Sequence, residues 1–517
     1  MRAIEAGAET SGVSLATLLV QAGTAVADRL VALHGRGATA TVLVGKGNNG
    51  GDALVAAGRL ASAYGWRLTI GVAMNRASDA HLVALHAPEY ASRVRIERVG
   101  ALAGAESVDA IDQAMAASTV VIDGLLGIGA SGPLRGDVEA VLARCAMVSR
   151  GPGQAWIAID IPSGVDADTG EAAQGAFRAT RTLSTGPAKP GCFVGEGATL
   201  AGYVDVLDIG LPERSWLRHE ARGVPDDGMI RRVGAREAAA ILPERPDHSH
   251  KGSFGRVLIV GGSGRYAGAP ALCALGAIHG GAGVVTVARP RRATGVGLPP
   301  EAVAVSMRRD DGAFDARDVE IVVDVSARMR ALVIGPGLGS EQSTMEAVRV
   351  LVAALPSAVP LVVDADGLNA LAGTMDDRDA PWVVTPHAAE MARLTGLSID
   401  EVLRDPIGVA RGSARRWGVI VVLKGAPTVI ASPRGSVVIG AHTNAALATG
   451  GSGDVLAGLI GALLSQGASP WHAAVVGVTL HAVAAEVWRR EHGNAGARAS
   501  DLAALLPKAR KVMVGMA

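Results

Sequence analysis

A glycine-rich loop followed by one carboxylate stands near the end of the chain, in "ATGGSGDVLAG" (448–458). Residues 450–453 are all glycine or serine, and Asp454 follows them directly. From Val455 to Leu464 the apolar residues recur at helical spacing, which predicts a loop that runs into the first turn of a buried helix. The free backbone N–H groups of such a turn attract anions. An acidic residue is unexpected at a position that suits a phosphate. One explanation is that Asp454 caps the helix.

Polar residues also follow three apolar, β-branched runs in the first half of the chain. These runs lead into "GKGNNGGD" (45–52), into Asp123 after "TVVI" and into Asp160 after "WIAI". Because the carboxyl ends of parallel strands meet at one edge of a sheet, we expect the three loops to converge on one crevice. Asn49, Asp123 and Ser163 offer hard oxygens for a monovalent or divalent cation. Asp160 could accept or donate a proton.

The "GKGNNGGD" loop lacks the GxGxxG spacing of a dinucleotide fingerprint. Its Asn48 and Asn49 add amide groups to the backbone N–H groups, which favours ligand binding. The alternative is a tight turn in which Asp52 is the N-cap of a helix that begins at Ala53.

The elements that must position these residues are strand–loop–helix units. In the first half they begin at 41, 119 and 156, and in the second half at 255, 331, 360 and 381. Such units predict parallel sheets covered by helices, and therefore an α/β fold of two three-layer α/β/α domains. The series is interrupted over 210–229, which is charged and has no clean period, so we place the boundary between domains 1–220 and 221–517. The stretch 420–442 alternates instead, and predicts antiparallel strands with a turn at Pro-Arg-Gly.

The composition limits the classes of protein. A chain of 517 residues is too long for one ordinary core. Its 49 basic and 49 acidic residues cancel, which argues against nucleic acid as a partner. Hydrophobic residues make up 49% but aromatic residues only 3%, a balance that suits helices packed on parallel strands.

The cysteines and the apolar runs indicate the compartment. Cys145, Cys192 and Cys273 are widely spaced and form no CxxC, which is typical of a reduced cytoplasmic protein. The N-terminus has no basic-then-apolar order, and the longest apolar runs are shorter than the roughly 20 residues that span a bilayer. We expect a soluble, cytoplasmic protein that does not act at a membrane, and that forms a homo-oligomer.

The first-half motifs "GKGNNGGD", "DGLLGIGASGPLRG", "AIDIPSGVDADTG" and "AKPG" together resemble the NAD(P)H-hydrate epimerase domain, over roughly residues 1–215. The resemblance implies a Rossmann-like fold that interconverts the R and S forms of hydrated NADH and NADPH (NADHX and NADPHX). It implies that Asp160 contacts the reacting end as a catalytic residue, and that Asn49, Asp123 and Ser163 bind potassium. The implied substrate-binding residues are Asn48, Asn49, Gly50, Gly51, Asp52, Gly127, Ile128, Gly129, Ala130, Ser131, Gly132, Pro133 and Asp160.

The second half carries "GPGLG", "DADGLNAL", "TPHAAEM", "LKGAPT" and "GGSGD" in this order. In this order they resemble the ribokinase-like superfamily, and specifically its ADP-dependent NAD(P)H-hydrate dehydratases, over nearly all of residues 225–517. The resemblance implies a ribokinase-like fold, ADP as co-substrate, Mg²⁺ as cofactor, and release of AMP and phosphate. Asp454 would then be the base that deprotonates the hydroxyl of the hydrated ring, with the N–H groups of 451–453 stabilising the phosphate charge.

Other roles in the second half are implied by position. Lys424, Gly425, Ala426, Pro427 and Thr428 match the nucleotide site, together with Gly453. Ala269, Gly337 and His387 match positions that touch the hydrated nucleotide. His387 follows Thr385-Pro386, which predicts an N-cap and first residue of a helix.

Two other interpretations remain open at this point. The second half could be an ATP-using kinase for a small alcohol, such as a vitamin precursor or a sugar, although the "NNGGD" half argues against it. The chain could also be a non-catalytic nucleotide-binding protein. Ala53 and the 126–130 loop, which depart from the epimerase pattern, are the support for that interpretation; Asp160 and Asp454 argue against it.

Overall fold

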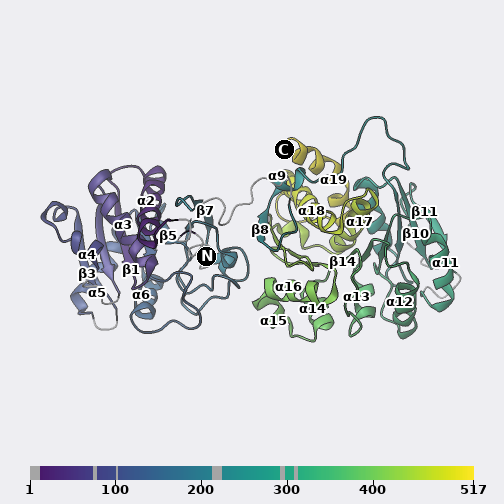
Figure 1. The fold of residues 1–517 in the computed structure, drawn as a ribbon, viewed down its shortest axis with the longest axis horizontal. Helices are drawn as coiled ribbons and strands as arrows, with labels where there is room; N and C mark the ends of the chain where they lie inside the picture. Colours follow the sequence, from purple (N-terminus) through teal and green to yellow (C-terminus); the bar gives the residue numbers. More distant parts are fainter. Residues whose placement is uncertain are drawn as a thin grey trace. The chain divides into compact units, whose positions relative to one another are not determined.

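The computed structural model describes residues 8, 12–73, 79–100, 103–211, 224–290, 297–307 and 313–516. The chain divides into two compact units, Met1–Glu220 and Ala221–Ala517 (Figure 1). Part of the stretch in which we place the boundary, residues 212–223, lies outside the described residues.

The first unit contains a parallel sheet whose strand order is β3-β2-β1-β4-β5-β6-β7. Its strands are β1 (Thr39–Val44), β2 (Arg67–Val72), β3 (Val94–Arg98), β4 (Val120–Gly124), β5 (Ala155–Ile159), β6 (Arg181–Thr185) and β7 (Tyr203–Leu207). Its helices are α2 (Leu15–His34), α3 (Asn48–Tyr64), α4 (Ala80–Ala84), α5 (Ala105–Ala117), α6 (Gly136–Met147) and α7 (Gly197–Leu200), with 3-10 turns η1 (Pro88–Tyr90) and η2 (Pro190–Cys192).

Two apolar clusters lie on opposite faces of this sheet. One joins the sheet to α2, α3 and α4, and the other joins it to α5 and α6. By length and composition α2 is also apolar enough to cross a membrane, but its Leu18, Val26 and Leu30 pack into the first of these clusters. The three-layer α/β/α arrangement predicted for this half is confirmed.

The second unit contains a sheet whose strand order is β11-β10-β9-β12-β13-β14-β15-β16-β17-β8. Its strands are β8 (Ile230–Val233), β9 (Arg256–Val260), β10 (Val284–Arg289), β11 (Val303–Ser306), β12 (Ala331–Ile334), β13 (Leu361–Val363), β14 (Trp382–Val384), β15 (Ile420–Leu423), β16 (Val429–Ala431) and β17 (Val437–Gly440). All neighbours are parallel except β15–β16 and β16–β17. The antiparallel strands predicted over 420–442 are therefore confirmed.

Helices cover both faces of the second sheet (Figure 1). One layer contains α9 (Ala235–Ala239), α10 (Ala269–His279), α17 (Ser452–Ser465), α18 (Pro470–His492) and α19 (Ala499–Val514). The other contains α11 (Ala316–Ser326), α12 (Gln342–Ala354), α13 (Asp366–Leu371), α14 (Ala388–Thr395), α15 (Ile399–Arg404) and α16 (Pro406–Trp417). The 3-10 turn η3 (Ala445–Leu447) precedes the glycine-rich loop. Helix α17 is buried along nearly its whole length, which explains why its sequence is apolar on every side.

Candidate functional site

The polar loops of the first unit lie at one edge of its sheet. Strands β1, β4 and β5 are parallel neighbours, so their carboxyl ends point the same way. The order of strands reverses between β1 and β4, which makes this edge the place where α/β sheets bind ligands. Asn49 follows β1, Asp123 is the next-to-last residue of β4, and Asp160 and Ser163 follow β5. The predicted convergence of the three loops is confirmed.

Three of these residues form one chain of hydrogen bonds. The Ser163 hydroxyl donates to Asp123 Oδ1 at 2.6 Å, and the Ser163 backbone N–H donates to Asp123 Oδ2 at 2.8 Å. The Ser163 hydroxyl also accepts from the Leu126 N–H at 2.9 Å. The Leu126 carbonyl in turn accepts from Asn49 Nδ2 at 2.6 Å. The structure thus brings Asn49, Asp123 and Ser163 together.

The donor atoms of this group fit a hard cation. Asn49 Oδ1 is buried and has no hydrogen-bond partner among the described residues, which is costly for a carbonyl oxygen unless a ligand satisfies it. Burial raises the pKa of Asp123 to about 6, against the lowering effect of its bonds from Ser163 and Leu125. A cation at this position would satisfy the amide oxygen and favour the ionised carboxylate.

The glycine-rich loop after β4 lines a pocket with the loop after β5. The pocket has a volume of about 690 Å³ and includes Ala130, Ser131, Gly132 and Pro133. Gly127 lies instead against Asn49, since a Cβ on Gly127 would be 3.3 Å from the Asn49 Cβ. Ile128 and Gly129, and the 48–52 segment, are not among the residues that line this pocket.

Asp160 has an unusual backbone and a buried cationic partner. Its φ is 67°, a conformation that side-chain-bearing residues rarely adopt. Its Oδ1 accepts from the Thr185 N–H at 3.2 Å, from the Thr185 hydroxyl at 2.8 Å and from Lys189 Nζ. The pair of Asp160 and Lys189 is buried. The structure therefore holds Asp160 in a fixed position at the site edge.

One alternative for the first loop is wrong. Helix α3 begins at Asn48 with Gly47 as its N-cap, so Asp52 lies inside the helix and does not cap it. Gly50 and Gly51 were interpreted as a turn, but they form the buried first turn of the helix. They are helical although glycine in a helix interior costs about 1 kcal/mol relative to alanine.

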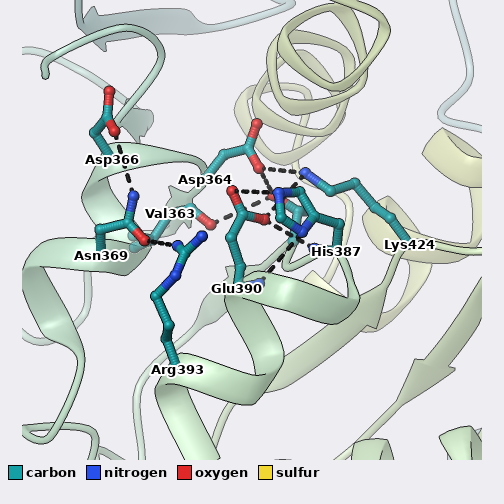
Figure 2. A network of polar contacts seen from close by, with 9 residues as sticks. Val363, Asp364, Asp366, Asn369, His387, Glu390, Arg393 and Lys424 are labelled. Atoms are coloured by element: carbon teal, nitrogen blue, oxygen red, sulfur yellow. Dashed lines mark hydrogen bonds and ion pairs between the residues drawn. The ribbon is translucent and has the colours of Figure 1, made fainter. Parts of the chain in front are cut away.

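In the second unit a lysine lies among acidic groups at three neighbouring strand ends (Figure 2). Lys424 follows β15, and its Nζ donates to Asp364 Oδ1, after β13, at 2.8 Å. The Thr385 hydroxyl, after β14, donates to the same oxygen at 2.8 Å. Glu390 Oε2 lies 3.7 Å from Lys424 Nζ. Burial alone would lower the pKa of Lys424, but Asp364 and Glu390 raise it, so the ammonium stays charged.

His387 is the N-cap of α14, which corrects the prediction that Thr385 caps this helix. Its Nδ1 accepts from the backbone N–H of Glu390 at 3.2 Å, and the backbone N–H of His387 donates to Glu390 Oε2 at 2.8 Å. Thr385 cannot cap because it is buried and its hydroxyl is bound to Asp364. The His387 side chain is half exposed, and its Nε2 lies 3.4 Å from Glu390 Oε1.

Asp454 lies in the first turn of α17. The N-cap of this helix is Gly451, with φ 89°, and Asp454 is the third helical residue. Asp454 is therefore not the N-cap, so the interpretation of this residue as the N-cap of the helix is wrong. Burial raises the pKa of Asp454 to about 7; Asp364 acts in the same direction and Lys424 opposes it. A carboxyl group of this kind can exchange a proton near neutral pH.

The segment 424–428 and the glycine-rich loop face each other across a pocket. A Cβ on Gly453 would lie 3.4 Å from Lys424 Nζ. The pocket has a volume of about 310 Å³ and is lined by Lys424, Gly425, Ala426 and Thr428, by Gly453, and by α18 residues such as His481. Pro427 does not line it. Burial lowers the pKa of His481 to about 4, so its imidazole is neutral.

Ala269 and Gly337, two predicted contacts of the hydrated nucleotide, lie side by side. A Cβ on Gly337 would be 2.9 Å from the Ala269 Cβ, and φ at Gly337 is 67°, so only glycine fits there without strain. Ala269 begins α10, which packs against α17: a Cβ on Gly451 would be 2.4 Å from Leu272 Cδ1. These residues therefore lie on the α17 side of the site.

Four residues of these two sites were missed from the sequence alone: Asp364, Thr385, Glu390 and Lys189. A signal existed for Asp364, which follows an apolar strand as Asp123 and Asp160 do. Lys189 stands in the quoted "AKPG", but no spacing relates it to Asp160. Its role depends on the pairing of β5 with β6, which the sequence does not show.

Comparison with known proteins finds a separate family match in each half of the chain. Residues 257–508 match a family described as NAD(P)H-hydrate dehydratase, and residues 15–191 match one described as YjeF-related protein N-terminus. A bifunctional NAD(P)H-hydrate repair enzyme of Salinibacter ruber is 36% identical, over 97% of this chain and 93% of that one. The enzyme of the same name from Escherichia coli is 32% identical, over 97% of this chain and 90% of that one. The chain belongs to the family of bifunctional NAD(P)H-hydrate repair enzymes, and the predicted resemblance is confirmed.

Among solved structures, the chain is similar over part of its length to an ADP/ATP-dependent NAD(P)H-hydrate dehydratase of Bacillus subtilis, co-crystallised with ATP and Mg²⁺. That protein is 33% identical, and the match covers 54% of this chain and 97% of that one, with a TM-score of 0.47.

Proposed function

We propose that the first unit epimerises R- and S-NAD(P)HX and that the second dehydrates S-NAD(P)HX to NAD(P)H with ADP, giving AMP and phosphate. The observation that carries the proposal is the position of Asp454, in the first turn of α17 beside Lys424 and a glycine-rich loop. Membership of the repair-enzyme family supports it over a small-alcohol kinase and over a non-catalytic protein.

The dehydration step uses groups of this chain in defined roles. Asp454 accepts the proton of the ring hydroxyl. The hydroxyl oxygen takes the terminal phosphoryl group of ADP, and AMP leaves. Lys424 and the N–H groups at the start of α17 stabilise the charge on the phosphoryl oxygens. The phosphorylated oxygen then leaves as phosphate, and loss of a ring proton restores the dihydronicotinamide.

Mg²⁺ would reach this site on the nucleotide. It commonly binds through phosphates, water and one or two carboxylates. Among the described residues no three His, Cys, Asp or Glu side chains gather as a metal site. The homo-oligomer and the cytoplasmic location stay predictions.

The direct test supplies purified protein with mixed NADHX epimers and either ADP or ATP. We expect the absorbance of NADH to return fully with ADP, because both epimers are used, with AMP and phosphate as products. Faster recovery with ATP alone would overturn the choice of nucleotide, and recovery limited to the S epimer would overturn the epimerase half.

The pKa of Asp454 predicts the pH dependence of dehydration. Burial raises this pKa to about 7, so the carboxyl group is protonated, and inactive as a base, below that pH. The rate should therefore rise as pH increases through about 7 and level off above it. The measurement is the initial rate on S-NADHX with saturating ADP from pH 5.5 to 8.5. A rate independent of pH across this range contradicts the assignment of Asp454 as base.

The orphaned oxygen of Asn49 predicts a potassium effect on epimerisation. Asp123→Asn keeps the shape of the side chain but removes the charge that would attract the cation. We expect the variant to epimerise more slowly and to lose its response to KCl, with choline chloride as the ionic-strength control. Dehydration of S-NADHX by the same sample controls for folding. Equal stimulation of both proteins by KCl would contradict a cation at this position.

A further inference from the structure

A buried lysine stands behind Asp160 in the first unit. Lys189, after β6, is only 3% exposed. Its Nζ contacts Asp160 Oδ1, the Thr185 carbonyl oxygen at 3.1 Å and Ser184 Oγ at 3.4 Å. An ammonium has three donors, so these contacts use all of them. Lys189 has no donor left for a substrate, and any role it has must act through Asp160.

The contacts of Asp160 are divided unequally between its two oxygens. Oδ1 receives Lys189 and both donors of Thr185. The described structure records no hydrogen bond to Oδ2. One oxygen therefore anchors the carboxylate, and the other is left for a ligand at the edge of the sheet.

This arrangement is costly for stability alone. A buried ion pair loses more hydration than its attraction usually returns, and a backbone at φ 67° adds strain at the same residue. Lys189 is the charged group that the structure places against Asp160.

We propose that Lys189 is a positioning residue for epimerisation, which holds Asp160 as a fixed carboxylate with Oδ2 directed to the substrate. The inference rests on the proposed epimerase function. The reacting centre of NAD(P)HX carries a hydroxyl and a ring nitrogen on one carbon. Oδ2 accepts the hydroxyl proton while the carbon–nitrogen bond opens with its electron pair on nitrogen. Closure on the other face reverses these steps, and Oδ2 returns the proton, so no other reactant is needed.

The test compares three variants in full-length protein. Lys189→Met should lower kcat of epimerisation by about 10²-fold, because a displaced catalytic group typically costs this much. KM should change little, since Lys189 does not contact substrate. Lys189→Arg keeps the charge and should recover part of kcat. Ser184→Ala removes a contact of Lys189 but none of Asp160, and should stay close to the unaltered rate.

A double variant separates positioning from a general structural effect. In the Asp160→Asn background, Lys189→Met should cost little more, because the group it positions is already lost. Dehydration of S-NADHX by the same samples reports intact protein. Thr185→Val removes one donor to Asp160 without burying an unpaired charge, and should lower kcat even if Lys189→Met folds poorly.

Two results would overturn the inference. An unchanged kcat in both Lys189→Met and Thr185→Val excludes the role, as does a full additional loss from Lys189→Met in the Asp160→Asn background. Failure of the proposed function looks different, because the unaltered chain would then not epimerise at all.

Discussion

Asp454→Asn should slow dehydration of S-NADHX by about 10²–10⁴-fold, the usual cost of losing a positioned general base. The variant keeps the shape of the side chain but cannot accept a proton. It should keep its fold, because the N-cap of α17 is Gly451 and no cap depends on the carboxylate. Affinity for ADP should persist, since Lys424 and the N–H groups of the loop remain. The measurements are kcat for dehydration and ADP binding by calorimetry.

A matched control exists in the same unit. Asp501 occupies the same third position in α19, where its carboxylate accepts from the Arg498 side chain and from the Arg498 backbone N–H at the surface; asparagine can still accept the backbone bond. Asp501→Asn should leave dehydration unchanged. Epimerisation, whose residues lie in the other unit, should be unaffected in both variants. Dehydration by Asp454→Asn within a factor of about two of the control would remove Asp454 from the mechanism.

The sequence predicted the strands around both candidate sites, because their apolar, β-branched runs are short and end in polar loops. These are β1, β4 and β5 in the first sheet, and β9, β12, β13, β14 and the antiparallel β15 to β17 in the second. The other strands of the two sheets were not predicted. The sequence also predicted which loops meet, since parallel strands place their carboxyl ends at one edge. Asn49, Asp123 and Ser163 were grouped in this way, and the structure joins them through Leu126. This inference needs only strand direction, which the strand–loop–helix units supply.

Local signals failed where tertiary packing decides the conformation. The sequence around Gly50 and Gly51 predicts a turn, but both are buried residues in the first turn of α3. Thr385 read as an N-cap, but its hydroxyl binds Asp364, which is 21 residues earlier in the chain. His387 takes the cap instead. At Thr385 a contact distant in sequence outweighs the local preference.

Side-chain pairs across strands were beyond prediction from one sequence. Lys424 was assigned to the nucleotide, and its ion pair with Asp364, 60 residues away, was missed. Asp160 was predicted to accept or donate a proton. Its ion-pair partner Lys189, which is 29 residues away, was missed because no local spacing relates the two. The family resemblance supplied the roles of single residues, whereas the structure supplied the partners that hold them in place.

Asp160→Asn should reduce epimerisation by about 10²–10⁴-fold while S-epimer dehydration continues. Asparagine suits this position, because with aspartate it is among the residues that best tolerate a positive φ. Its amide oxygen can accept the bonds that Lys189 and Thr185 now make to Oδ1, so the site should keep its shape. What is lost is the second oxygen as a proton acceptor.

The measurement separates the two reactions on one sample. With excess ADP and mixed epimers, the Asp160→Asn variant should consume the S epimer at the normal rate and then stop, because R-NADHX converts only at its slow uncatalysed rate. Asp28→Asn makes the same substitution in a surface ion pair of the same unit, with Arg59 at 2.7 Å, and should epimerise normally. If Asp160→Asn consumes both epimers as fast as this control, the proton is carried by another group, and the buried pair of Lys189 and Asp160 has only a structural role.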